Sequence, residues 1–404
     1  MSAQPADPRP SRANLVLATL FLGMFVAGSS ELLVVGVLDL IAADLRLTIP
    51  AAGSLVTAYA LGLALGGPIM TALTIRLNKR TVLIGALAAF VAGSLVVMMT
   101  DSYPLMLAAR TLTGAVQGLF IAAAFATGIS VVPPERMGRA IGVVVSGVSV
   151  SGAIGVPLGT LASQSIGWRG SFAAIAALSA IMLIATLAVV PSVPSQGAGA
   201  RDQVRHALAP RVLAVLALGS LLFASVYAAL TYIVPFLQEV TGISGALISV
   251  YILAYGVATA VGSFVGGRFA DTNATRTLTV AAIGATLCLL VLHFVGTIPV
   301  LVALTILAWG VFAFVTAPAF QYRVISLAGP GGALAQSLPA SAANLGIAFG
   351  SYAGGAAIGA FSTSAAITAA LVLSVITIPV AWATGLLRPP PATQPATQPE
   401  EAGV

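Results

Sequence analysis

The sequence predicts an all-α membrane protein in which twelve transmembrane helices form two pseudo-symmetric six-helix bundles. Of its 404 residues, 59% are hydrophobic and 7% are charged, whereas a soluble domain carries about 25% charged residues. Twelve apolar segments are long enough to cross a hydrocarbon core about 30 Å thick as helices. One polar interruption, at 191–211, separates them into two sets of six. A β-barrel would instead need alternating segments of about ten residues.

The predicted elements follow in chain order. Residues 1–13 form a polar cytoplasmic tail without the features of a signal peptide. The first bundle, 14–190, has spans at 14–38, 50–73, 81–100, 104–130, 138–164 and 169–190. After the cytoplasmic linker 191–211, the second bundle, 212–387, has spans at 212–238, 244–267, 277–296, 299–322, 332–360 and 363–387. Residues 388–404 are rich in Pro and Thr and are predicted to be a disordered cytoplasmic tail.

The positions of Lys and Arg predict the orientation. With the N-terminus inside, 14 of the 17 basic residues fall on the cytoplasmic side, Arg46 and Arg169 fall opposite, and Arg110 lies within a span. Cytoplasmic loops retain positive charge, so both termini are expected in the cytoplasm and the chain in a bacterial plasma (inner) membrane. The net charge of +6 is then an orientation signal and not a nucleic-acid patch.

The two halves repeat weakly. Residues 75–80 and 271–276 follow the second and eighth spans at an offset of 196, and Gly114 and Gly310 share that offset in the fourth and tenth spans. Duplicated membrane halves are typical of secondary transporters, whose substrate site lies near the bilayer midplane between them.

Two charged residues lie well inside spans, Glu31 in the first and Arg110 in the fourth. At 1.5 Å per residue they lie about 10 Å and about 9 Å from the outer ends of their helices, so their depths match. Buried charges in a bilayer are costly and usually face a cavity or a partner. Glu31 is a candidate proton-binding group and Arg110 a fixed positive charge beside it. The alternative is a static pair that fixes helix packing.

Five further polar residues in spans are candidates for the wall of a substrate cavity. They are the amides Gln117 and Asn344 and the phenols Tyr227, Tyr232 and Tyr255. A phenol presents an apolar ring with a polar tip. The alternatives are hydrogen bonding between helices for the amides and core packing for the rings.

The fifth span carries an ordered string of small residues with a proline, formed by Gly152, Gly155, Pro157 and Gly159. Small residues let helices approach closely in lipid, and Pro157 frees a backbone carbonyl and permits a bend. The alternative is close packing alone.

Several motifs occur in the order of a known family. They are Gly28 to Glu31 with Gly36 to Asp44, Gly67 to Leu83, Arg110 with Gly114, Gln117 and Gly118, Gly152 to Gly159 with the following Gly-Trp-Arg, and Asn344 to Gly346. Over residues 14–387 the chain resembles a major facilitator superfamily transporter. In particular, it is similar to the twelve-span drug:proton antiporters near bacterial sugar-efflux, arabinose-efflux-like and chloramphenicol-exporter members.

The resemblance implies roles for these motifs. Spans one, four, seven and ten would line the cavity, Arg110 would take part in proton coupling, and the string in the fifth span would mark an exporter. The gating loops would contain Arg76, Lys79, Arg80, Asp271 and Arg276. Ile75 and Asn78 depart from the motif, which usually carries Asp and Gly there, so the gating charge pair is expected only from Asp271.

The expected function is proton-coupled export of a drug, sugar or related metabolite by alternating access. The sequence has no phosphate-binding loop, metal-ligand cluster or activated nucleophile, so we expect neither an enzyme nor a metal or cofactor, with the proton gradient as energy source. The expected partners are a small-molecule substrate, protons and the lipid bilayer, with no nucleic acid, for a monomer. The alternatives are an uptake symporter or uniporter of the same fold and a non-transporting membrane sensor.

Overall fold

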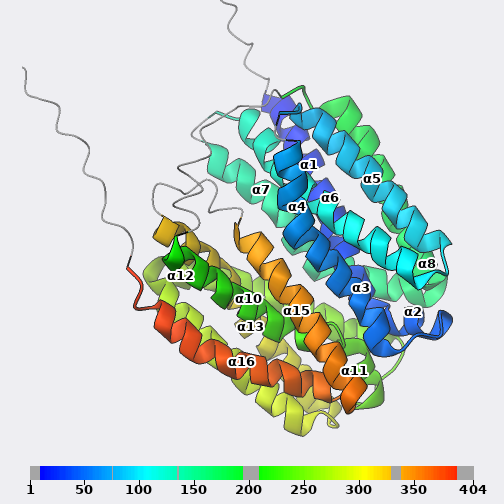
Figure 1. The fold of residues 1–404 in the computed structure, drawn as a ribbon, viewed down its shortest axis with the longest axis vertical. Coiled ribbons are helices and arrows are strands. Elements are labelled where there is room, and N and C mark those ends of the chain that lie inside the picture. Colours follow the sequence, from blue (N-terminus) through cyan, green and yellow to red (C-terminus); the bar gives the residue numbers. More distant parts are fainter. Residues whose placement is uncertain (1–9, 75, 134–135, 194–208, 329–337, 389–404) are drawn as a thin grey trace, which may run out of the picture.

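The structure, a computed structural model, describes residues 10–74, 76–133, 136–193, 209–328 and 338–388 (Figure 1). The first half contains α1 (Pro10–Gly36), α2 (Leu38–Asp44), α3 (Ile49–Leu61), α4 (Gly67–Leu73), α5 (Lys79–Met99), α6 (Tyr103–Ser130), α7 (Met137–Val150) and α8 (Val156–Val189). The second contains α10 (Pro210–Leu230), α11 (Ile233–Glu239), α12 (Ala246–Val295), α13 (Pro299–Ala328), α15 (Leu338–Ala360) and α16 (Ala365–Thr384). The π-helical turns Gly62–Gly66 and Ser151–Gly155 join α3 to α4 and α7 to α8.

Two long helices each join residues of two successive spans at a sharp bend. In α8 the bend is at Gly167, whose φ of 70° lies in the left-handed region that favours glycine. In α12 it is at Asn273, whose side chain caps the next segment by accepting a hydrogen bond from the Arg276 backbone at 2.9 Å. Both bends lie where the sequence predicts the ends of spans.

The described residues contain ten helices long and apolar enough to cross a membrane. The remaining two spans correspond to α7 with the start of α8, which a π-helical turn interrupts, and to the glycine-rich α15. Figure 1 shows the helices of the first half (blue to green) beside those of the second (green to red). The fold class predicted from the sequence, twelve helices in two bundles, is confirmed.

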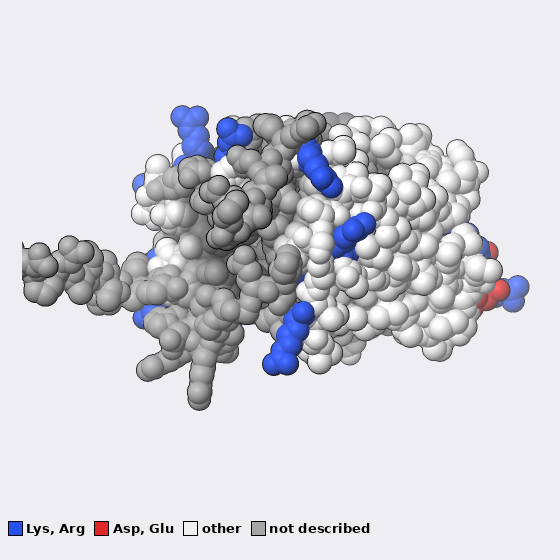
Figure 2. Space-filling view, turned by 90° about the horizontal axis from the view of Figure 1, so that it is seen from above, with Lys and Arg blue, Asp and Glu red and all other residues white. Residues whose placement is uncertain are grey.

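Charged side chains gather at the two ends of the molecule. On the face in Figure 2, most of the visible Lys and Arg lie on one side and toward the middle, red Asp and Glu appear together with further blue at the opposite edge, and the surface between them is white. We call these the basic end, with Arg12, Arg80 and Arg323, and the acidic end, with Asp39 and Glu239. An apolar band between charged ends is what a membrane-spanning chain requires.

The two halves contact each other toward the acidic end, where α3 packs against α15. The side chain of Gln238 donates to Asp39 at 2.8 Å, and that of Gln164 donates to the Gly245 carbonyl at 3.1 Å. Gly53 of α3 lies so close to the Tyr232 ring that a β-carbon there would collide with it. We call these contacts the acidic-end junction.

At the basic end, the loop between α4 and α5 is tied to its own half. The Asn78 side chain caps α5 by accepting from the Arg80 backbone at 3.0 Å, and it also donates to Ser192 at 2.5 Å. The Arg80 guanidinium donates to the Leu187 carbonyl at 2.5 Å. Among the predicted gating residues, Arg76 is exposed, while Ile75 and the side chain of Asp271 lie outside the described residues.

Candidate functional site

Glu31 points into the first bundle from α1. Its carboxylate oxygen Oε2 accepts a hydrogen bond from the Gln117 side-chain nitrogen of α6 at 2.8 Å. The preceding residue, Ser30, is 1% exposed, yet the Glu31 side chain itself is only partly buried. The carboxylate therefore lies deep in the bundle without being sealed in the packed core.

Gln117 links Glu31 to a third residue, Tyr59 of α3. The Tyr59 hydroxyl donates to the Gln117 amide oxygen, and the Gln117 amide nitrogen donates to the Glu31 carboxylate. Each residue thus donates to the next, from Tyr59 to Gln117 to Glu31, and the Glu31 carboxylate is the last acceptor of this hydrogen-bond series. Gln117 is 2% exposed and Tyr59 1%, and buried polar groups of this kind need such partners. We call this series of hydrogen bonds the glutamate relay.

Arg110 holds the backbone of α1 rather than the carboxylate. Its guanidinium donates to the carbonyls of Ser30 at 3.2 Å and Glu31 at 3.3 Å, and to Leu55 of α3 at 3.5 Å. It also stacks over the Tyr59 ring, 4.0 Å from the centroid. In the part of the chain that the structure describes, both ion pairs involve Arg169 and neither involves Arg110. The structure thus brings the two predicted residues together without a direct charge pair.

The sequence around Gly114 explains why these side chains meet. Arg110 and Gln117 are seven residues apart and share one face of α6. Gly114 lies between them, and a β-carbon there would come within 3.0 Å of the Leu63 backbone nitrogen and still closer to the Tyr59 carbonyl. Glycine at this position therefore lets α3 approach closely enough for Tyr59 to reach both polar side chains.

The second half presents phenols opposite this site. Tyr227 of α10 is 5% exposed. Tyr255 of α12 packs its ring 5.1 Å from that of Trp309 of α13. The Tyr255 hydroxyl and the Trp309 indole nitrogen are buried and have no hydrogen-bond partner among the described residues. Tyr227 and Tyr255 are therefore both buried in the second half, and their place in the wall of a substrate cavity stays a prediction.

Two other predicted cavity residues lie elsewhere. The Tyr232 hydroxyl donates to the Ser351 carbonyl at 2.8 Å, and its ring packs against Gly53. Tyr232 is therefore part of the acidic-end junction, which is a correction to its predicted cavity position. The Asn344 amide nitrogen donates within its own helix, to the Ala340 carbonyl at 3.0 Å, and its amide oxygen is unpartnered.

The predicted exporter motif lies against the helix that carries Glu31. A β-carbon at Gly155 would come within 3.1 Å of the Ser29 β-carbon, and one at Gly159 within 2.8 Å of Leu33. Gly152 has no such close neighbour, and the side chain of Pro157 lies outside the described residues. The close-packing interpretation therefore accounts for Gly155 and Gly159, which set the distance between α1 and α8.

The comparisons with known proteins identify the family. Residues 20–333 match the Major Facilitator Superfamily. The chain belongs to this superfamily. It is 32% identical over 353 residues, 86% of its length and 90% of the relative's, to the inner membrane transport protein YdhP of Escherichia coli (strain K12). It is 29% identical over 341 residues, 83% of its length and 87% of the relative's, to a chloramphenicol resistance protein of Streptomyces lividans.

A solved structure supports the fold of this facilitator. A bacterial homologue of the human lysosomal transporter Spinster superposes with a TM-score of 0.80 at 15% identity, covering 93% of this chain and 98% of that one. The chain is therefore a multi-pass membrane transporter, and members of its family are transporters rather than enzymes.

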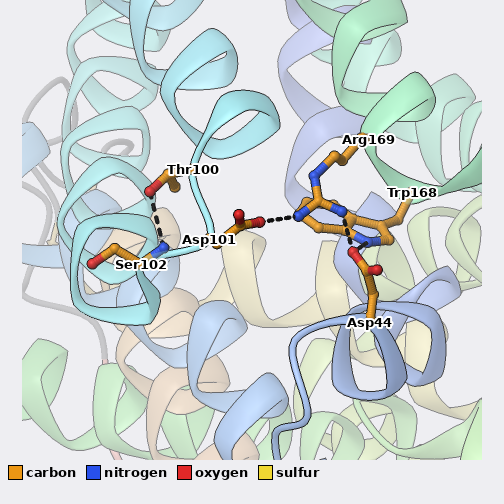
Figure 3. Close-up of polar contacts among 6 residues, drawn as sticks. All are labelled: Asp44, Thr100, Asp101, Ser102, Trp168 and Arg169. Carbon is orange, nitrogen blue, oxygen red and sulfur yellow. Dashed lines mark hydrogen bonds and ion pairs between the residues drawn. The ribbon is translucent and has the colours of Figure 1, made fainter.

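The facilitator also has a polar cluster at its acidic end, shown in Figure 3. Arg169 lies between Asp44 and Asp101 and pairs with both, and its guanidinium stacks over the Trp168 ring at 4.2 Å. Trp168 donates to Asp44 at 3.0 Å. The hydrogen bond from Arg169, followed by that from Trp168, lowers the pKa of Asp44 below its ordinary value. The cluster ties the end of α2 and the loop before α6 to α8.

Tyr59 and Trp309 were missed in the sequence analysis. In the sequence, neither Tyr59 nor Trp309 stands out, because both look like ordinary uncharged aromatic residues of an apolar span. The signal that identifies Tyr59 is the internal repeat, because it precedes Tyr255 by the same 196 residues that separate Gly114 from Gly310.

Proposed function

We propose that this facilitator exports a small organic molecule in exchange for protons, and that Glu31 is the proton-binding group. The observation that carries the proposal is that the Glu31 carboxylate is bonded to a neutral amide, Gln117, while Arg110 is satisfied by backbone carbonyls. Protonation of Glu31 then leaves no buried cation unpaired, whereas breaking a buried ion pair costs several kcal/mol. The carboxylate is free to cycle between its two charge states during transport.

The asymmetric contact between the halves supports alternating access. The junction toward the acidic end must open to expose the site there, and the relay lies between the two ends. In this proposal the basic end lies in the cytoplasm of a bacterial inner membrane, with both termini on that side. One chain supplies both halves of the site, so a monomer suffices.

A cellular assay tests the proposal. The name of one relative makes chloramphenicol the first compound to test. Expression in a bacterial host that lacks its own exporters should lower chloramphenicol accumulation, and Glu31→Gln should abolish this effect. Glu239→Gln is the matched control, because Glu239 is exposed at the acidic end. Accumulation that rises on expression would favour the uptake symporter, and full export by Glu31→Gln would contradict the role of that residue.

A further inference from the structure

The internal repeat relates the polar site of the first half to a site in the second. Gly114 lies against Tyr59, and Gly310 lies against Tyr255 in the same way. Each residue of the second pair follows its counterpart by 196 positions, and the same offset takes Glu31 to Tyr227. The two arrangements are therefore structural counterparts.

The interiors of the two halves correspond as well. A small cavity in the first half is lined in part by Ala27, Gln117 and Phe120. A second cavity, between α10 and α13, has at the equivalent positions Phe223, Ala313 and Thr316, each 196 residues later. The second cavity is further lined by Val226 and Phe314, and the Phe314 ring meets that of Tyr255 edge to face at 6.5 Å. The ring of Phe314 therefore lies between this cavity and Tyr255, the phenol that corresponds to Tyr59.

The two sites differ in whether their polar groups are paired. Ile306 and Ala313 occupy the positions equivalent to Arg110 and Gln117. The Tyr255 hydroxyl consequently lacks the amide that Tyr59 has, and the neighbouring Trp309 indole is unpartnered too. Tyr255 is 8% exposed and Trp309 0%. Buried hydrogen-bonding groups without partners are rare and costly in a folded protein, so this pair can take a partner that the described residues do not supply.

We propose that Tyr255 and Trp309 form the ligand-binding subsite of the transporter, and that it takes an uncharged aromatic molecule with a hydrogen-bond acceptor. An indole N–H only donates, while a phenol donates and accepts, so an acceptor oxygen of the ligand satisfies both. The rings of Tyr255, Trp309 and Phe314 provide aromatic walls for a ligand ring. The inference rests on the proposed export function and assigns the ligand to the second half, across from the proton on Glu31.

The charge distribution of the second half favours an uncharged ligand. Its described Arg and Glu residues lie toward or beyond the ends of spans: Arg211, Glu239, Arg268, Arg276, Arg323 and Arg388. Among the side chains that the structure describes in this half, none is placed to act as counter-ion to a charged ligand at Tyr255, and desolvating such a ligand would be costly.

Ligand binding to the purified full chain tests the subsite by calorimetry. The probes are chloramphenicol and 4-nitroacetophenone, both uncharged aromatic acceptors, with 4-nitrobenzoate as the charged control. We expect the uncharged probes to bind, and Tyr255→Phe and Trp309→Phe to weaken binding about tenfold, as for one lost hydrogen bond. Tyr322→Phe, an exposed position on α13, should change nothing.

A second variant adds the missing partner. Ala313→Gln places in the second half the amide that Gln117 provides in the first, and we expect it to raise the Tm while abolishing probe binding. Unchanged affinities in Tyr255→Phe and Trp309→Phe, binding of 4-nitrobenzoate alone, or no binding of either uncharged probe would each overturn the subsite. None of these results bears on proton coupling through Glu31, which the export assay tests separately.

Discussion

Arg110 donates to the backbone carbonyl of Glu31 at 3.3 Å and leaves the carboxylate of the same residue to Gln117. The Arg110 guanidinium therefore holds the backbone of α1 in position, and the neutral amide of Gln117 holds the Glu31 carboxylate. In the proposed cycle, this separation lets the acid change its charge without loosening the helix that carries it.

The first prediction concerns the guanidinium of Arg110. In Arg110→Lys a single ammonium group replaces the planar guanidinium, which donates hydrogen bonds to carbonyls on two helices. We expect transport to fall at least about tenfold and the free energy of unfolding to fall by roughly 2 kcal/mol, the range for hydrogen bonds to charged groups. Transport and thermal unfolding measure the two effects. Arg268→Lys, at an exposed position, is the control, and wild-type transport by Arg110→Lys would contradict the assignment.

The second prediction concerns the glutamate relay. Gln117→Leu removes the partner of both Glu31 and Tyr59, so we expect strongly reduced transport and an altered pH profile of what remains. Tyr59→Phe removes only the far end of the relay and should have the smaller effect on the profile. The pH dependence of transport in both variants measures this. Equal profiles for Gln117→Leu and the wild type would show that the amide does not position the acid.

The third prediction concerns pH and Asp44. Its pKa is lowered from the ordinary value of 3.8 in the folded state, so its contribution to stability is present above that value and is lost as pH falls through the folded pKa. The Tm of Asp44→Asn should lie below that of the wild type at neutral pH, and the difference should close in acid. Because the cluster is exposed, the effect should also shrink in high salt. A difference that persists in acid would contradict this account.

The fourth prediction concerns the acidic-end junction. Asp39 and Gln238 come from opposite halves and are hydrogen-bonded, so cysteines at both positions should form a disulfide under oxidation and block transport. Reduction should restore transport, because the halves must separate here once per cycle. Each single cysteine variant is the control, since the natural Cys288 is buried. Transport that continues in the crosslinked protein would show that the junction does not open.

The sequence predicted the spans well because apolar length alone determines them, and it placed Glu31 and Arg110 together because their depths match. It did not predict that Gln117, rather than Arg110, would contact the carboxylate. Which side chain contacts the carboxylate depends on how closely α3 approaches α6 at Gly114. The residue pattern of a single helix does not give this distance between two helices. Tyr232 was misplaced for a similar reason, since its depth allowed a cavity position, but the neighbouring Gly53 and Ser351 draw it into the junction.

Proton movement coupled to substrate in proteoliposomes tests the central claim most directly. With the purified chain and a pH-sensitive dye inside the vesicles, addition of a transported compound should move protons in the opposite direction in the wild type and in Glu239→Gln. We expect Glu31→Gln to lose this coupled proton flux while it still binds the compound. Full coupled flux by Glu31→Gln would contradict it.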